Sequence, residues 1–596
     1  MKTNILKNNN MMRPIYIKFL AVLIVSVLTQ SCDTWLEEDN KSAFTIDNYF
    51  TDEVALQGAL TGVYSRLQNL YNGNMHGVGQ MGTDESMSTR LTNYRGILDQ
   101  YEYTAAERSI QETWEKYYRL VLNANLVISR APTTPKVTEV TLNRVIAEAK
   151  FLRAFAYFRL VQFFGEVPIM KDELTSFDYS IGRDSIPLVY QFIIDDLKYA
   201  IQENYLSKDK GVVGANHWAA RALLGKVYCT MASAKYAGKV KGYQDVEMSV
   251  GDLYKEAKIH LNEVINSGLY DLESNYGDLF LIKNKNINKE SIFEIQFVSL
   301  AGFGASWSKE MGVFGRSYAN SQQINAMCGI TSVKVVPSFW KIYRANDVRR
   351  SWSIADYWIQ FLNNATVMPT TRTYFSTQKT TLPDGTSVNI DMTNDLHLID
   401  KTLLARIGIS KYRWGEGDNP DDYWKQPMRY PVELCPNNVI VLRYADVLLM
   451  FIEADMGEDG DMDNGLSTTA LTYLNAKIIF RARGNKLPTS AYPNFTASNF
   501  KLDDLVDERG REFCFEFQRW NDLARFGKLK QRLANRVYNT AESDGGVSYN
   551  VNKFDESKHY LFPIPQRERN LSLNKEGLFQ NPGYADAAID DDVSTE

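Results

Sequence analysis

The sequence predicts a mainly α-helical fold, a tetratricopeptide-like scaffold of about four helix pairs with a large irregular region packed on it. Two segments indicate this class. Residues 147–164 carry apolar side chains on two helix faces, which is typical of a helix packed between neighbours. In residues 218–228, Leu224, Gly225 and Tyr228 match part of the tetratricopeptide pattern.

The N-terminus is predicted to be a lipoprotein signal. Residues 1–31 carry four basic side chains and no acidic one, and residues 19–28 form an apolar run. This run is shorter than the ~20 residues of a membrane-spanning helix, so it is the expected core of a cleaved signal peptide. Ser31 directly precedes Cys32, as the small residue of a lipobox does. We therefore expect a signal peptide over 1–31, lipid on Cys32 and a flexible acidic tether over 32–45.

Helical periodicity continues along the chain. The segment ending at residue 164 is followed by Gly165 and Pro168, which stop a helix. In chain order the helices make four pairs, the fourth separated from the third by about 170 residues. Four pairs are enough to bury a continuous core. The other expected helices span residues 52–70, 109–130, 186–204, 251–267, 440–456 and 466–483.

Residues 270–435 differ from the helical segments. They are rich in Gly, Asn, Thr and aromatic residues and include a strand-like run at 292–297, so short strands and irregular structure are expected. We expect a single domain over 46–596. Its predicted parts are a helical scaffold over 46–269 and 440–484, a loop-rich insertion over 270–439, a C-terminal region over 485–584 and an acidic tail over 585–596.

The composition excludes several classes of protein. With 66 basic and 72 acidic residues the net charge is −6, which argues against nucleic acid as a partner. The five cysteines and five histidines are scattered, which excludes C-x-x-C motifs and clustered zinc ligands, so we expect no metal and no cofactor. The 34 Tyr, 29 Phe and 10 Trp leave rings for recognition at the surface.

Two motifs resemble ligand loops but lack the required context. Residues 77–82 fit G-x-G-x-x-G, yet a polar stretch follows where a dinucleotide site needs a helix, so a flexible loop is expected. Asp459, Asp461 and Asp463 resemble the start of a calcium loop. Asn464 stands where that loop needs glycine, and we therefore expect a solvated turn.

Ordered sequence blocks carry a family resemblance. They lie at residues 148–154 with 165–168, 218–224, 442–449, 475 with 481–484, 508–516, 519–527, and 563–565 with 580–584. These blocks and the lipobox resemble the SusD/RagB family of surface lipoproteins, over nearly the whole mature chain. The resemblance implies oligosaccharide binding at the outer leaflet of the outer membrane and a role as the lid of a SusC-like TonB-dependent transporter, without catalytic residues. Charged residues at helical spacing in these blocks are expected to form an ion-paired structural network, namely Glu508, Arg509, Glu512, Glu516, Arg519 and Asp522.

Sugar binding requires flat aromatic faces and polar side chains that pair with hydroxyls. Two stretches offer both, residues 72–95 and 301–325. Buried packing explains any single ring there equally well. Trp307 is the strongest candidate, because its Gly/Ser/Ala-rich loop forms no core by itself. The other candidate contacts are Phe303, Asn74, Asp84, Arg90, Tyr94, Arg316 and Tyr318.

The sequence therefore predicts a lipid-anchored, surface-exposed oligosaccharide-binding protein of the outer membrane that is not an enzyme. Two alternatives remain open. One is binding of peptide or protein cargo in the grooves of the helix pairs. The other is a surface glycoside hydrolase, which needs two carboxylates at a defined separation across a cleft.

Overall fold

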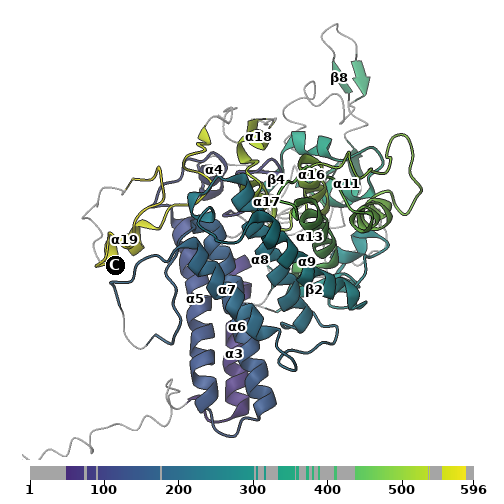
Figure 1. The fold of residues 1–596 in the computed structure, drawn as a ribbon. Helices are drawn as coiled ribbons and strands as arrows, with labels where there is room; N and C mark the ends of the chain where they lie inside the picture. The colour runs from purple at the N-terminus through teal and green to yellow at the C-terminus, as the bar shows by residue number, and fades with distance from the viewer. Residues whose placement is uncertain are drawn as a thin grey trace, which may run out of the picture. The chain divides into compact units, whose positions relative to one another are not determined.

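Helices dominate the computed structural model of this chain (Figure 1). The structure describes residues 49–72, 77–88, 92–174, 178–300, 304–305, 315–316, 333–355, 357–360, 371–374, 379–381, 387–389, 408–412, 436–534, 536 and 553–585. Residues 52–596 form one compact unit. No helix in the described ranges is long and apolar enough to cross a bilayer.

The scaffold is a series of long helices, each packed on the next. They are α3 (Glu53–Tyr71), α5 (Arg108–Arg130), α6 (Glu139–Phe164), α7 (Ile186–Ala200), α8 (His217–Ala237), α9 (Val250–Asn266) and α13 (Tyr444–Gly457). The last of these packs against α9, so the fourth pair joins the scaffold directly despite its distance in sequence. Its second helix is divided into α14 (Thr468–Thr472), the π-helical η12 (Tyr473–Ile479) and α15 (Phe480–Ala482). The predicted fold class is confirmed.

Helix α6 lies at the centre of the scaffold. Every residue from Val145 to Phe164 except Lys150 is buried, as its two apolar faces predict. The helix ends at Gly165, as expected. In the next pair, Gly225 of α8 lets Leu261 of α9 approach so closely that a Cβ at this glycine would lie 2.7 Å from it. The small residue of the tetratricopeptide pattern therefore has a packing role.

The strand expected at 292–297 is confirmed and has a partner that the sequence did not predict. β2 (Ser291–Ile295) pairs with β11 (Val439–Arg443) in an antiparallel register that places Val439 opposite Ile295. The helix predicted from residue 440 was therefore wrong at its start, and α13 begins at Tyr444. The β-branched residues before it suit a strand, and hydrogen bonding to β2 decides their conformation.

Smaller elements complete the described chain. The strands are β1 (Ser86–Ser88), β3 (Gly315–Arg316), β4 (Val333–Val335), β5 (Ile354–Ala355), β6 (Tyr357–Gln360), β7 (Thr371–Tyr374), β8 (Lys379–Thr381), β9 (Ser387–Asn389) and β10 (Gly408–Ile409). The short helices are α4 (Tyr94–Asp99), α11 (Val348–Ser353), α16 (Leu502–Glu512), α17 (Arg519–Arg525), α18 (Leu529–Ala534) and α19 (Gln566–Leu571). The 3₁₀ turns are η3 (Ala131–Thr133), η4 (Lys241–Tyr243), η5 (Tyr276–Phe280), η6 (Ile282–Asn284) and η8 (Pro337–Ile342).

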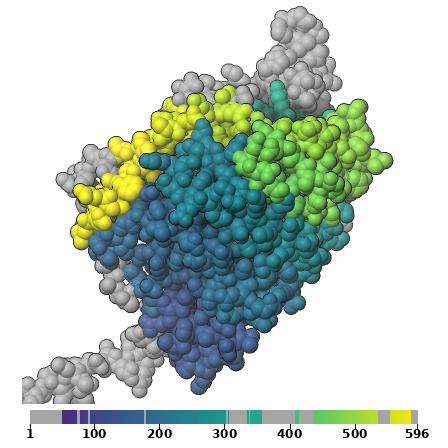
Figure 2. All heavy atoms as spheres, in the orientation of Figure 1, coloured from purple at the N-terminus to yellow at the C-terminus, as the bar shows by residue number. Residues whose placement is uncertain are grey.

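The C-terminal segment 553–585 returns to the first helices of the scaffold. Figure 2 shows it, in yellow, on the surface beside the blue helices. The Phe562 amide donates to the Phe163 carbonyl over 2.7 Å, and the Asn581 side chain donates to the Phe164 carbonyl over 2.9 Å. These contacts fasten the segment to the end of α6.

The G-x-G-x-x-G segment is a buried turn and not the flexible loop that was expected. Val78, Gln80 and Met81 are buried, and the amide of Met81 donates to the Gly77 carbonyl over 2.9 Å. Gly79 has a φ of +86°, and a Cβ there would lie 2.9 Å from the ring of Phe163. Both the backbone conformation and the close approach require glycine.

We predict that Gly79→Ala lowers the free energy of unfolding by about 2 kcal/mol, because it adds left-handed strain and a clash. Thermal or denaturant unfolding measures the change. The matched control is Gly62→Ala in α3, where an added Cβ meets nothing within 4 Å and the helix gains propensity. Equal destabilisation by both substitutions would contradict the assignment.

Candidate functional site

The two stretches proposed for ligand binding begin side by side. The Asn72 side chain at the end of α3 donates to the carbonyl of Gly304 over 2.8 Å. In the first stretch, residues 77–85 (the first loop) lead into β1. This strand pairs antiparallel with β4, so that Ser86 lies opposite Val335 and Ser88 opposite Val333. The first stretch therefore contacts the start of the second at Asn72 and Gly304, and its strand β1 pairs with β4, which follows the second stretch, across more than 200 residues of sequence.

Cys32, the predicted lipid site, lies outside the described residues, and so do most of the candidate ligand contacts, namely Asn74, Arg90, Phe303, Trp307 and Tyr318. Arg316 belongs to β3, which runs parallel to β6 with Arg316 opposite Gln360. Tyr94 is the first residue of α4 and is half-buried, with the guanidinium of Arg95 4.5 Å from its ring centre. Asn93 caps this helix by accepting from the Gly96 amide over 3.0 Å. Among these candidate contacts, the structure describes the side chain of Tyr94, which lies in the first stretch after β1.

Asp84 has a different position from the one proposed for it. The residue is 7% exposed, and its two carboxylate oxygens accept from Nε and Nη2 of Arg519 over 2.7 and 2.6 Å. Such a bidentate pair occupies the carboxylate that a sugar hydroxyl would need. We therefore assign Asp84 to the support of the loop, which it fastens to α17.

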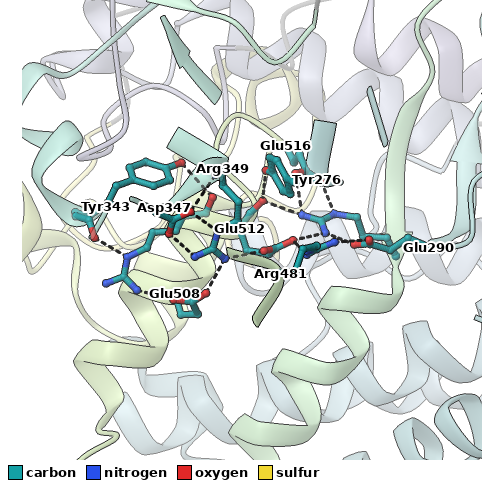
Figure 3. Close-up of polar contacts among 12 residues, drawn as sticks. Tyr276, Glu290, Tyr343, Asp347, Arg349, Arg481, Glu508, Glu512 and Glu516 are labelled. Atoms are coloured by element: carbon teal, nitrogen blue, oxygen red, sulfur yellow. Dashed lines mark hydrogen bonds and ion pairs between the residues drawn. The ribbon is translucent and has the colours of Figure 1, made fainter. Parts of the chain in front are cut away.

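A further buried network of ion pairs has Glu512 at its centre (Figure 3). The Glu512 carboxylate accepts from Arg349 over 2.8 Å, from Arg443 over 2.6 Å and from Arg481. All four residues are at most 2% exposed. Although burial alone would raise it, the three guanidiniums hold the pKa of Glu512 well below its usual value.

Further acidic residues surround the same arginines. Glu290 bonds Arg443 and Arg481, Glu508 bonds Arg349 and Arg511, Glu516 bonds Arg443 and Lys411, and Asp347 bonds Arg349. Behind them, Arg509 pairs with Asp446 and Asp522, each over 2.9 Å. The ion-paired structural network expected from the sequence is confirmed. These carboxylates are committed to guanidiniums, which leaves them unsuited to acid or base catalysis.

Sequence reasoning found Glu508, Glu512 and Glu516 but missed several of their basic partners and the acidic residues Glu290 and Asp347. Arg443 and Arg481 lie in family blocks, whereas Glu290 and Arg349 lie outside them. No local spacing connects these residues to residues 508–516, since the contacts arise only when the segments pack together.

The described residues contain no group of three or more His, Cys, Asp or Glu side chains that could hold a metal ion. Asp459, Asp461 and Asp463 are exposed in a turn, as expected. Within the described ranges, Cys229 and Cys514 are buried and free.

Two family models match the chain. The model described as "SusD family" covers residues 289–584, and the model described as "Starch-binding associating with outer membrane" covers residues 34–229. The chain belongs to the SusD/RagB family. The scaffold from α3 to the first half of α8, α13 and the C-terminal network thus lie within SusD-type sequence.

Relatives support the same assignment. A SusD-like protein of Bacteroides ovatus is 27% identical over 532 residues, covering 88% of this chain and 85% of the relative. SusD-like protein P2 of Formosa agariphila is 25% identical over 95% of this chain and its own full length. A SusD homolog from Bacteroides thetaiotaomicron superposes with a TM-score of 0.69 at 24% identity, covering 90% of this chain and 98% of its own. A structure titled "Laminarin binding SusD-like protein" has a TM-score of 0.61 at 22% identity, covering 90% of this chain and 100% of its own.

In this SusD-like protein, the base of the first loop contains a carboxyl with an unusual pKa. Glu85 is 1% exposed; one oxygen accepts from Gln80 Nε2 over 2.6 Å, and the other has no partner. Burial raises its pKa to about 7, although Gln80 and Arg519 oppose this. A proton on the second oxygen would turn it into a donor, and Gln80 Oε1 is a buried acceptor that also lacks a partner.

We predict that Glu512→Gln lowers the free energy of unfolding by roughly 3–5 kcal/mol, because it leaves three buried guanidiniums with too little negative charge. Urea denaturation followed by circular dichroism measures this. Glu203→Gln is the control, since Glu203 is an exposed carboxylate paired with Lys208 and its loss should leave the midpoint unchanged. If the urea midpoint of Glu512→Gln equalled that of the unaltered protein, the proposed stabilising role of the network would be contradicted.

Glu85 predicts a pH dependence of stability. Between its ordinary pKa of 4.5 and about 7, the unfolded chain loses the proton of Glu85 while the folded chain retains it. Stability therefore falls as pH rises through this window, by about 3 kcal/mol in total. Glu85→Gln lacks this loss, so its stability relative to the unaltered protein should increase from pH 4.5 to 7 and then level off. Denaturant titrations at a series of pH values test this, and a difference independent of pH would contradict the assignment.

Proposed function

We propose that this protein is a lipid-anchored, non-enzymatic oligosaccharide-binding protein that delivers its ligand to a SusC-like TonB-dependent transporter. The observation that carries the proposal is that the two aromatic and polar stretches meet at Asn72 and Gly304, while β1 of the first stretch pairs with β4, which follows the second. The lipobox at Cys32 and the family description "associating with outer membrane" support attachment to the outer membrane surface.

Related structures support a glycan as the ligand. One is titled a laminarin-binding protein, and another is titled a crystal structure with xylogluco-oligosaccharide. This chain would bind its glycan by stacking rings such as Trp307 on pyranose faces while polar side chains pair with hydroxyls. The rigid base lowers the entropy cost of ordering the loops on binding.

The absence of catalysis is part of the proposal. Among the described carboxylates at this segment, Asp84 is paired with Arg519, Asp99 is paired with Arg536, and Glu85 is buried at its Gln80 contact. A glycosidase needs two carboxylates that face a bound sugar.

We predict that Trp307→Ala weakens glycan binding by roughly tenfold or more, because it removes a stacking face. Affinity electrophoresis in gels containing different polysaccharides identifies the ligand, and calorimetry with its oligosaccharides gives the affinity. The matched control is Tyr236→Ala, which removes an exposed ring from α8 and should leave binding unchanged.

If no polysaccharide in the gels slowed the migration of the protein, glycan binding would be contradicted. Equal affinity in Trp307→Ala would contradict the role of this ring. Release of reducing sugar by the purified protein would contradict the non-enzymatic assignment.

One observation favours peptide cargo as the second candidate. A cleft of about 320 Å³ lies between α5, α19 and the chain around residue 179, and its lining includes Trp114, Tyr118, Tyr179 and Leu571. Tyr179 and Leu571 are 47% and 52% exposed, which is typical of surfaces that bind apolar groups. Saturable peptide binding that is lost in Tyr179→Ala, without retardation by any polysaccharide, would favour this candidate.

A further inference from the structure

Two small adjacent cavities lie inside the scaffold between α6, α8 and α17. The inner cavity, of about 10 Å³, is lined by basic and polar groups that include Arg159, Lys226 and Asn521. The outer cavity, of about 30 Å³, shares Asn521 with it and extends to Lys239, which is exposed. The inner space suits one water molecule or one small ion, and the outer one provides a route from the surface.

The charges around the inner cavity do not balance. Lys226 pairs with Asp446 over 2.7 Å, and Arg509 pairs with Asp446 and Asp522 over 2.9 Å each. Arg525 pairs with Asp522 over 3.0 Å and with Glu453 over 2.5 Å. These three basic residues thus have three carboxylates, and all three carboxylates are buried. Arg159 also lines the cavity and pairs with no carboxylate among the described residues.

Arg159 is a buried guanidinium with little compensation. It is 6% exposed; Nη1 donates to Gln162 Oε1 over a long 3.4 Å, and Nε has no acceptor. Tyr71 interacts with it only as a neutral phenol, because burial raises the pKa of Tyr71. Burial together with the charges of Arg509 and Arg159 lowers the pKa of Lys226 in spite of Asp446, as an excess of positive charge requires. An isolated buried charge is costly unless it is paired.

Asn521 gives a second, independent indication. It is 6% exposed and lines both cavities, yet among the described residues neither its amide nitrogen nor its oxygen has a hydrogen-bond partner. A buried amide in a native protein almost always has partners, so a species in the cavity must supply them. A water molecule would satisfy the amide but would leave the positive charge of Arg159 unbalanced.

We propose that the inner cavity binds a monovalent anion of about the size of chloride, held by the Arg159 guanidinium and the Asn521 amide nitrogen beside Lys226. Such an ion supplies both the missing acceptor and the missing negative charge. Larger anions such as sulfate do not fit the volume. The site joins α6, α8 and α17, and the bound ion therefore stabilises the folded state in proportion to its occupancy.

Bromide scatters anomalously and replaces chloride, so it is the direct probe. Crystals of the unaltered protein soaked in sodium bromide should show an anomalous peak between Arg159 and Asn521. In solution, the melting temperature should rise and saturate with added sodium chloride relative to sodium gluconate at equal ionic strength. Arg159→Met should lose this halide-specific rise.

Arg144→Met is the matched control, because it makes the same substitution on the same helix at an arginine that pairs with Glu148. It should retain the halide response. Absence of a bromide peak, with water alone in the cavity, would overturn the proposal, as would a halide response in Arg159→Met equal to that of the control. If Arg159→Met does not fold, the bromide measurement on the unaltered protein still decides the question.

Discussion

The fold depends on burying Glu512 among three guanidiniums. Removing a carboxylate and arginines from water costs several kcal/mol per ion, and only complete pairing offsets this cost. Arg349 comes from the start of α11, Arg443 from the end of β11 and Arg481 from α15, so these segments must dock together on α16. The network therefore favours one arrangement of the insertion and the C-terminal region over others.

Another buried ion pair lies at the candidate binding stretches. Arg519 follows this network in sequence and binds Asp84, which fastens the first loop to α17. Asn72 donates to Gly304 at the start of the second stretch, and β1 pairs with β4 just after that stretch. Two candidate binding stretches that are far apart in sequence are thus held next to each other by contacts of the folded chain.

Much of the fold could be predicted from the sequence because the long helices have strong periodicity and clear stops. Residues 147–164 were identified from two apolar faces, and Gly165 ended the helix as expected. The error at residues 440–443 arose because an apolar β-branched run suits both a helix and a strand, and only pairing with β2 decides between them. Asp84 was misassigned for a similar reason, since a polar residue in a glycine-rich stretch looks exposed until its partner, 435 positions away, is known.

By itself, the sequence determined the helical class, the lipobox motif, the family and the charged residues of 508–522 that form buried ion pairs, because each is encoded in local spacing or in composition. The tertiary structure alone decided which residues complete that network, that the two candidate binding stretches meet at Asn72 and Gly304, and that Arg159 is buried with no carboxylate partner among the described residues. These are contacts between segments far apart in the chain. The energies of these contacts depend on the distance between the groups and on their burial in the folded chain, and local sequence patterns contain neither quantity.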